Sequence, residues 1–307
     1  MPNATCFLLA YALVLLAELA RFALRQEDAR RWAARSALVL FLVSLGTHTL
    51  YLVDRLWMHW GSEERGPWFG TWQDWGIFVA WMIAWALMVM WWRRSDKQIG
   101  LFVLPLILGL IGVSVAVPSV SPIASSQAAT VSFWRLVHSV AMMVGTMLVT
   151  LGFASAAMYY VHAWKLKRRG MGRDSIRLPS LEYLQSMGRN CILGSAAAVG
   201  FGVVSGAVMN FTRDGQVAWT DRGIVFTGGL FLWLCFAAMA QRFSANRGRG
   251  EWTAAVNVLS FIIVVILLAM IVSSPHGQDA PHGMLEAPSS VWSRFENASC
   301  SLHGGSA

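Results

Sequence analysis

Charged residues are scarce in this chain: Asp, Glu, Lys and Arg make up only 13% of its 307 residues, whereas hydrophobic residues make up 56%. The mean hydropathy is +0.52. One soluble core could not keep that much apolar surface away from water. The composition therefore excludes a soluble globular domain and requires a lipid bilayer as the solvent.

Paired cysteines are also lacking, because Cys6, Cys191, Cys235 and Cys300 form no CxxC or CxxCH motif. The sequence thus lacks the pattern of a thiol redox centre and that of covalent c-type haem attachment to its own chain. Tyrosine is rare, with 5 residues against 16 Trp and 16 Phe. Such amphipathic rings commonly settle at headgroup depth, which indicates a protein that works at the membrane interface.

Apolar runs of membrane-spanning length are the dominant pattern that is present. They cover residues 5–24, 36–53, 76–92, 100–117, 136–163, 190–209, 223–241 and 253–273. We therefore predict an all-α polytopic membrane helix bundle of about eight transmembrane helices in residues 1–273. Residues 274–307 are rich in Ser, Gly, Pro and Ala, and we expect a flexible external tail there.

Basic residues are concentrated in every second connection between these runs. The four connections 21–35, 93–98, 164–189 and 242–251 hold 18 of the 24 Lys and Arg residues. The positive-inside rule places these connections in the cytoplasm and both termini outside. Topology thus explains the net charge of +8, and no nucleic-acid partner is expected.

The first apolar run has no basic residue ahead of it, while Arg21 and Arg25 follow it, so we interpret it as a retained helix and not as a secretory signal. Glu18 lies within two turns of both arginines, and we expect it to pair with them. A proton relay is the alternative for Glu18. Acids and bases are otherwise nearly absent at midplane depth, which disfavours a coupled transporter.

Small residues recur at four-residue spacing on the sixth run, at Gly194, Ala198, Gly202 and Gly206. This pattern permits a neighbouring helix to approach the backbone closely. It is equally compatible with the general tolerance of membrane helices for small residues.

The histidines are the most informative polar residues. His48, His138 and His276 all fall toward the predicted outer side, with His59 as a fourth candidate and His162 at the opposite side. Two neutral imidazoles on separate helices can close both axial positions of one porphyrin. For each histidine taken singly, a hydrogen bond to a carbonyl group or to water is the alternative.

Tryptophans crowd the predicted outer connection between the second and third runs, which reads RLWMHWGSEERGPWFGTWQDWG. Such a density of rings can form a flat apolar platform for a planar macrocycle. An aromatic belt that anchors the connection at the headgroups is the alternative. Trp134 and Trp219 add aromatic surface on the same predicted side.

Several of these segments together resemble the CcsA/HemX-type cytochrome c assembly proteins, the family of System II haem handling. The similarity covers roughly residues 36–280 and rests on the following segments: FWRLVHSVAMMVGTMLVTLGFASAAMYYVHAWKLKRRG, LPSLEYLQSMGRNCILGSAAAVGFGVVSGAVM, THTLYLVDRLW, IGLFVLPLILGL and SSPHG.

The resemblance implies roles for particular residues. In that family, two external histidines ligate haem that is presented on the outer surface. His138 and His276 match their positions, so the resemblance makes them the expected ligands of the haem iron, with haem b as the expected cofactor. His48 lies where the family often has a histidine near the outer end of an early span.

The sequence also departs from the family pattern. A tryptophan-rich WGxxWxWDP-type motif is expected between the sixth and seventh spans, but this chain reads NFTRDGQVAWTDRG there and keeps only Trp219 and Asp221. A membrane histidine is expected just before the arginine that ends the seventh span, and Ala240 stands there instead. Both departures are typical of a diverged, HemX-like member more than of a complete haem lyase.

Together these features predict a membrane component of c-type cytochrome biogenesis that binds or presents haem at the external face of the cell (inner) membrane of a bacterium. At most the chain is part of a holocytochrome c synthetase. Expected partners are haem, a CcsB-like membrane protein, apocytochrome c and the lipid bilayer. Two alternatives stay open: a HemX-like regulatory or scaffolding protein of tetrapyrrole metabolism without haem-lyase activity, and a small-molecule transporter.

Overall fold

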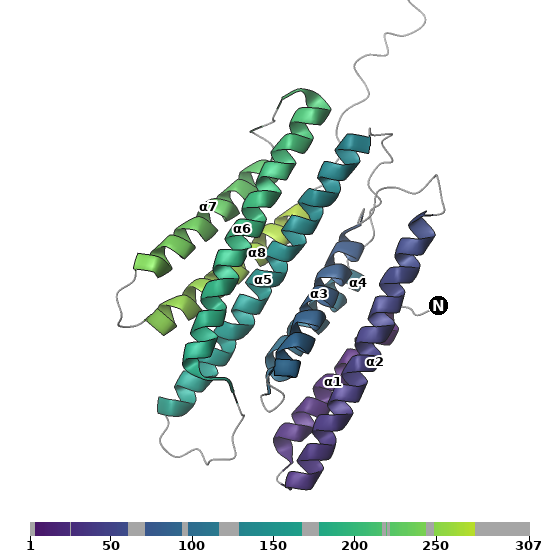
Figure 1. Ribbon diagram of the computed structural model, residues 1–307, viewed down its shortest axis with the longest axis vertical. Helices are drawn as coiled ribbons and strands as arrows, with labels where there is room; N and C mark the ends of the chain where they lie inside the picture. The colour runs from purple at the N-terminus through teal and green to yellow at the C-terminus, as the bar shows by residue number, and fades with distance from the viewer. Residues whose placement is uncertain are drawn as a thin grey trace, which may run out of the picture. The chain divides into compact units, whose positions relative to one another are not determined.

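The computed structural model of the chain describes residues 4–24, 26–60, 71–93, 98–116, 129–167, 178–216, 219, 222–243 and 249–273. Within those ranges the chain forms helices and no strands (Figure 1). The helices are α1 (Ala4–Ala23), α2 (Glu27–Trp60), α3 (Trp72–Arg93), α4 (Gly100–Ala116), α5 (Ala129–Lys167), α6 (Leu181–Asp214), α7 (Arg222–Phe243) and α8 (Arg249–Ser273). The all-α prediction and its eight helices are confirmed.

Six of these helices, α2, α3, α5, α6, α7 and α8, are long and apolar enough in their described parts to cross a membrane. Helix α4 is apolar but shorter, with 17 residues, and α1 has 20 residues. The chain is therefore a multi-pass helical membrane protein.

Several helices are longer than the apolar runs that predicted them. Helix α6 begins at Leu181, where the Ser180 hydroxyl caps it by accepting a hydrogen bond from the Tyr183 backbone N–H at 3.4 Å. The prediction that residues 164–189 form one connection is therefore wrong in its last part, since LEYLQSMGRN is the start of α6. A helix satisfies its own backbone hydrogen bonds in water as well as in lipid, so the end of an apolar run need not end it.

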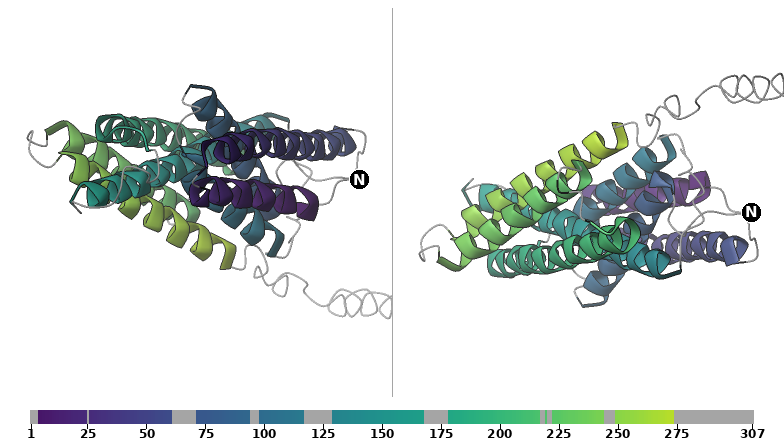
Figure 2. Two further views of the ribbon diagram at one scale, coloured as in Figure 1. Left: turned by 90° about the horizontal axis from the view of Figure 1, so that it is seen from below. Right: turned by 90° about the horizontal axis from the view of Figure 1, so that it is seen from above.

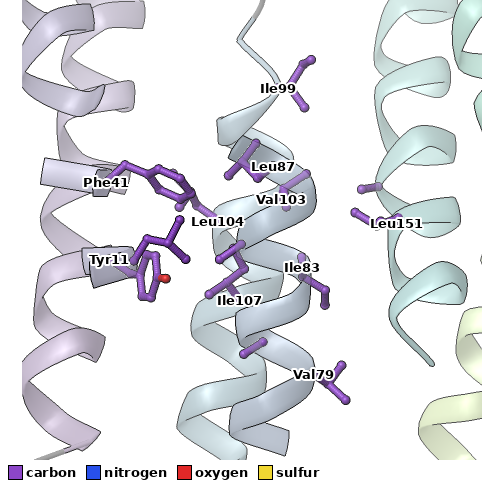
Figure 3. Packing of buried hydrophobic residues seen from close by; sticks show 14 of the residues in the cluster. Tyr11, Phe41, Val79, Ile83, Leu87, Ile99, Val103, Leu104, Ile107 and Leu151 are labelled. Atoms are coloured by element: carbon purple, nitrogen blue, oxygen red, sulfur yellow. The ribbon is translucent and has the colours of Figure 1, made fainter. Parts of the chain in front are cut away.

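Large side chains fill the core among α1 to α5. Figure 3 shows Tyr11 of α1 and Phe41 of α2 on one side of α4, facing Leu104 and Ile107. On the far side of α3, Leu151 of α5 belongs to the same buried cluster. Aromatic and branched aliphatic side chains thus hold the first half of the chain together.

Small residues, in contrast, dominate the contact between α5 and α6, which lie side by side (Figures 1 and 2). A Cβ atom added at Gly194 would lie 2.9 Å from Leu148, and one at Gly202 would lie 2.8 Å from Met142 Sδ, both on α5. The close helix approach predicted from the sixth apolar run is confirmed. Because glycine has no side chain, α5 and α6 pack tightly at these positions.

Helix α8 joins this pair through a buried asparagine. The Asn257 amide lies against Gly152 of α5 and Gly188 of α6, where a Cβ atom at Gly188 would be 2.9 Å from Nδ2. Nδ2 also donates a hydrogen bond to the Thr253 carbonyl oxygen at 2.8 Å. We call this arrangement of Asn257, Gly152 and Gly188 the asparagine seat.

Charged groups mark the two ends of the helices. The basic end is the end at which the chain passes from α1 to α2, α3 to α4, α5 to α6 and α7 to α8. There Glu18 pairs with Arg21 at 3.3 Å, which confirms the predicted local partner. At the opposite end, Arg55 of α2 pairs with Asp74 of α3 at 2.7 Å.

Candidate functional site

His138 is the site residue whose surroundings are best suited to bind a metal. The ring is half-buried on α5, toward the end opposite the basic end. Its Nδ1 atom lies 2.7 Å from the carbonyl oxygen of Gly202 on α6. A carbonyl oxygen can only accept, so Nδ1 carries the proton, and in the neutral imidazole the lone pair is then on Nε2.

The Nε2 atom of His138 is left available by this arrangement. Among the described residues no hydrogen bond to Nε2 is found, and the atom is not sealed in the protein interior. Metal-bound histidines commonly donate their second ring N–H to a backbone carbonyl group, which fixes the tautomer and the ring direction. The hydrogen bond to Gly202 provides this second interaction.

A glycine one turn further along α6 lies against the same ring. A Cβ atom added at Gly206 would lie 3.0 Å from His138 Nδ1 and 3.2 Å from Cε1. Any side chain at position 206 would therefore press on the imidazole. Gly202 and Gly206 form what we call the glycine cradle of His138.

The remaining predicted ligands and platform residues are only partly described. Trp134 is half-buried one turn before His138, with its ring centroid 5.6 Å from that of Phe133. Trp219 lies in the turn after α6 with 72% of its surface exposed. The predicted site residues His276 and Asp221 are outside the described residues.

His48 has a different environment, closed on all described sides. Its ring is fully buried and is stacked on Phe7 of α1, with centroids 4.4 Å apart and planes within 4° of parallel. The Tyr11 hydroxyl lies 3.4 Å from Nδ1. Nε2 is buried without a hydrogen bond, and the imidazole packs near the backbone of Ile77 on α3. While Phe7 stays in place, its ring occupies the face of the imidazole on which it is stacked.

The structure does not bring His48 and His138 into one described site, because the contacts of the first come from α1 and α3 and those of the second from α6. His162 lies toward the basic end of α5 and its Nδ1 donates to the Pro179 carbonyl oxygen at 3.0 Å. His59 is on the last turn of α2, and its side chain is outside the described residues.

The predicted tryptophan-rich connection is partly helical. Trp57 lies on α2 with 80% of its surface exposed, whereas Trp72 and Trp75 start α3 and contact each other with ring centroids 6.2 Å apart. Thr71 caps that helix: its hydroxyl accepts from the Asp74 backbone N–H at 3.1 Å and donates to the Asp74 carboxylate at 2.7 Å. The rings are thus split between two helices that the Arg55–Asp74 ion pair joins.

The sequence analysis did not predict that the Gly202 carbonyl oxygen accepts a hydrogen bond from His138. The repeat of small residues on the sixth run signalled a close helix contact there. It did not signal which side chain of the neighbouring helix would meet the exposed backbone.

Comparison with known protein families identifies a family for this chain. The model of the Cytochrome C assembly protein family matches residues 72–276, about two thirds of the chain. The chain belongs to this family. No curated protein and no solved structure matches it.

Membership of the cytochrome c assembly family gives the chain a role in cytochrome c biogenesis, a haem-related process. The match begins at the first residue of α3 and includes α3 to α8. His138 and its glycine cradle are therefore inside the matched region, as is position 276. His48 and the two helices α1 and α2 precede it.

Proposed function

We propose that this cytochrome c assembly protein binds haem b at the end of the membrane opposite the basic end and presents it to an apocytochrome c. In this proposal His138 and His276 are the two axial ligands of the iron. The hydrogen bond of 2.7 Å from His138 Nδ1 to the Gly202 carbonyl oxygen carries the argument. It holds the neutral tautomer whose Nε2 atom can bind iron.

The residues around His138 would perform three tasks. The Gly202 carbonyl would keep the ring from rotating and make Nε2 more basic. Gly206 would leave room for the ring. Trp134, one helical turn earlier, would cover apolar macrocycle surface.

Haem itself would supply the vinyl groups that react with the cysteines of a CxxCH motif. The chain would orient those groups and keep bulk water from one face. A CcsB-like membrane partner would complete the assembly, which operates at a bacterial inner membrane.

His48 has a structural role in this proposal. Its parallel contact with Phe7 and its complete burial support packing between α1 and α2, not ligation.

The test is the visible absorption spectrum of the detergent-purified protein, oxidised and reduced with dithionite, for the wild type, His138→Ala and His276→Ala. The wild type should show low-spin b-type haem in the reduced state. Either substitution should lower the bound haem at least about ten-fold, because a lost axial ligand affects affinity no less than a lost supporting interaction.

His162→Ala is the matched control for His138→Ala. Both imidazoles lie on α5 and both donate through Nδ1 to a backbone carbonyl oxygen, but His162 does so toward the basic end. Its haem content should equal that of the wild type. A wild type free of haem, or equal losses in His138→Ala and His162→Ala, would contradict the proposal.

A HemX-like regulatory or scaffolding role is the second candidate. It is favoured by the α6–α7 connection, where Trp219 is the remaining tryptophan of the expected motif. Under this function the purified protein would contain no haem and would copurify with a protein of tetrapyrrole synthesis. Under the first, it would copurify with a CcsB-like protein.

A further inference from the structure

The surface between α5 and α8 at the basic end contains a hollow of about 730 Å³ that the haem proposal does not use. Three half-exposed aromatic side chains form its walls: Tyr160, Trp164 and Trp252, with exposed fractions of 42%, 45% and 45%. Ala163 and Ala255 also line the hollow. The hollow exists because two alanines stand where larger side chains would fill the seam between the helices.

The hollow is closed on the side that faces away from the basic end. Further along the same seam, the rings of Phe153 on α5 and Phe261 on α8 stack with centroids 4.3 Å apart. Between the hollow and Phe261 on α8, Asn257 of the asparagine seat lies against Gly152 and also fills the seam. A ligand in the hollow therefore cannot pass between the helices and must continue over their outer surface.

An apolar track leads out of the hollow on that outer surface. Leu259, Ile262 and Ile266 follow Ala255 at helical spacing on α8, and their exposed fractions are 43%, 45% and 51%. Residues spaced by three and four lie on one face of a helix. The track thus runs from the basic end toward the middle of the predicted span, in the direction that an acyl chain takes in a bilayer.

A single exposed ion pair lies at the mouth of the hollow. Lys167 Nζ is 3.7 Å from Glu251 Oε1, with 77% and 63% of the two side chains exposed. An ion pair this open to solvent contributes little to stability. Lys167 can therefore exchange Glu251 for another anion at low cost.

We propose that this hollow binds an acidic glycerophospholipid. Lys167 binds the phosphate in place of Glu251, the Tyr160, Trp164 and Trp252 rings surround the glycerol region, and one acyl chain lies along Leu259, Ile262 and Ile266. Aromatic rings with a lysine at headgroup depth are the recognition chemistry for such an amphiphile. This inference does not depend on haem binding, so either proposal can fail alone.

The test uses native mass spectrometry of the delipidated full chain, titrated with phosphatidylglycerol or with phosphatidylcholine. Lys167→Gln should weaken phosphatidylglycerol binding about five-fold, since one basic residue near a membrane surface contributes about that factor. Glu251→Gln should strengthen it, because the competing carboxylate is gone. Arg93→Gln is the matched control, with an exposed arginine in the last turn of α3, and should bind like the wild type.

Ala255→Leu tests the hollow without a change in charge. The larger side chain should weaken binding of both lipids, and inorganic phosphate should not compete with phosphatidylglycerol. Equal affinity of the wild type for both lipids, equal effects of Lys167→Gln and Arg93→Gln, or weaker binding after Glu251→Gln would overturn the proposal. Competition by inorganic phosphate would overturn the choice of a lipid over a free anion.

Discussion

The two buried helix contacts around His48 and around His138 are built from opposite kinds of residue. Around His48, α1 and α2 meet through large rings, with Phe7 stacked on the imidazole and Tyr11 at its edge. Around His138, α5 and α6 meet through missing side chains, at Gly202 and Gly206. The first contact covers its histidine completely, and the second leaves one ring nitrogen available.

This difference teaches that the neighbouring helix decides what a membrane histidine can do. A stacked ring covers one face of an imidazole, and a second ring at its edge completes the packing, which makes the histidine a packing residue. A glycine partner offers a backbone carbonyl group at short range, which orients the imidazole without covering it. The family match includes the second contact and not the first.

The largest effect should come from removal of a ring in the first contact. Phe7→Ala should lower the free energy of unfolding by about 3 kcal/mol, because it leaves a cavity over His48. Leu9→Ala, on the same helix with 63% exposure, is the control and should cost much less. Reversible unfolding in detergent measures both, and equal values for the two variants would show that α1 is not held through its rings.

A second effect of Phe7→Ala sharpens the same comparison. The buried His48 ring should become open to acylation by diethylpyrocarbonate, which peptide mass spectrometry detects at that residue. Modification of His48 in the wild-type protein would mean that the cover over this ring opens without any substitution.

In the glycine-packed region, added atoms should be harmful instead. Gly188→Ala places a Cβ atom 2.9 Å from Asn257 Nδ2 and 3.1 Å from Ser155 Oγ. Overpacking of this kind typically costs about 1–3 kcal/mol, and we expect a net loss near 2 kcal/mol in the same unfolding measurement. Gly109→Ala, where a Cβ atom meets nothing within 4 Å, is the control and should be neutral or stabilising. A higher free energy of unfolding for Gly188→Ala than for the wild type would show that the asparagine seat can hold the added methyl group without overpacking.

The smallest effect should appear at the glycine cradle. Gly206→Ala forces the His138 ring to shift by a few tenths of an ångström. Bound haem should fall by about ten-fold at limiting haem, equivalent to about 1.4 kcal/mol, with the fold retained. Gly194→Ala is the matched control on the same helix, because its Cβ atom would meet only the flexible end of Leu148. Equal haem loss in both variants would assign the effect to helix packing and not to the ring.

Much of the fold could be predicted from the sequence, since the apolar runs marked all eight helices. The helical spacing of the charges predicted the pairing of Glu18 with Arg21. The ends of α6 could not be predicted from hydropathy, because a Ser180 cap starts it and Gly215, with φ of 70°, ends it. Neither cap changes the apolar pattern. Sidedness of the membrane stays a prediction from the basic connections.

The candidate site was harder to predict because its contacts are distant in the sequence. His48 and Tyr11 are 37 positions apart, and His138 and Gly202 are 64 positions apart. The sequence predicted the same position for both histidines, near the outer ends of membrane spans. Only the arrangement of the helices shows that one ring is covered and the other is not.

The asparagine seat also has a mechanical consequence for α8. Asn257 fits between Gly152 and Gly188, whereas Phe261, one turn later, is too large to take its place. A shift of α8 along its axis by one turn would therefore meet a steric block. The seat therefore fixes the position of α8 along its axis near the basic end, whereas His138 lies toward the opposite end of α5.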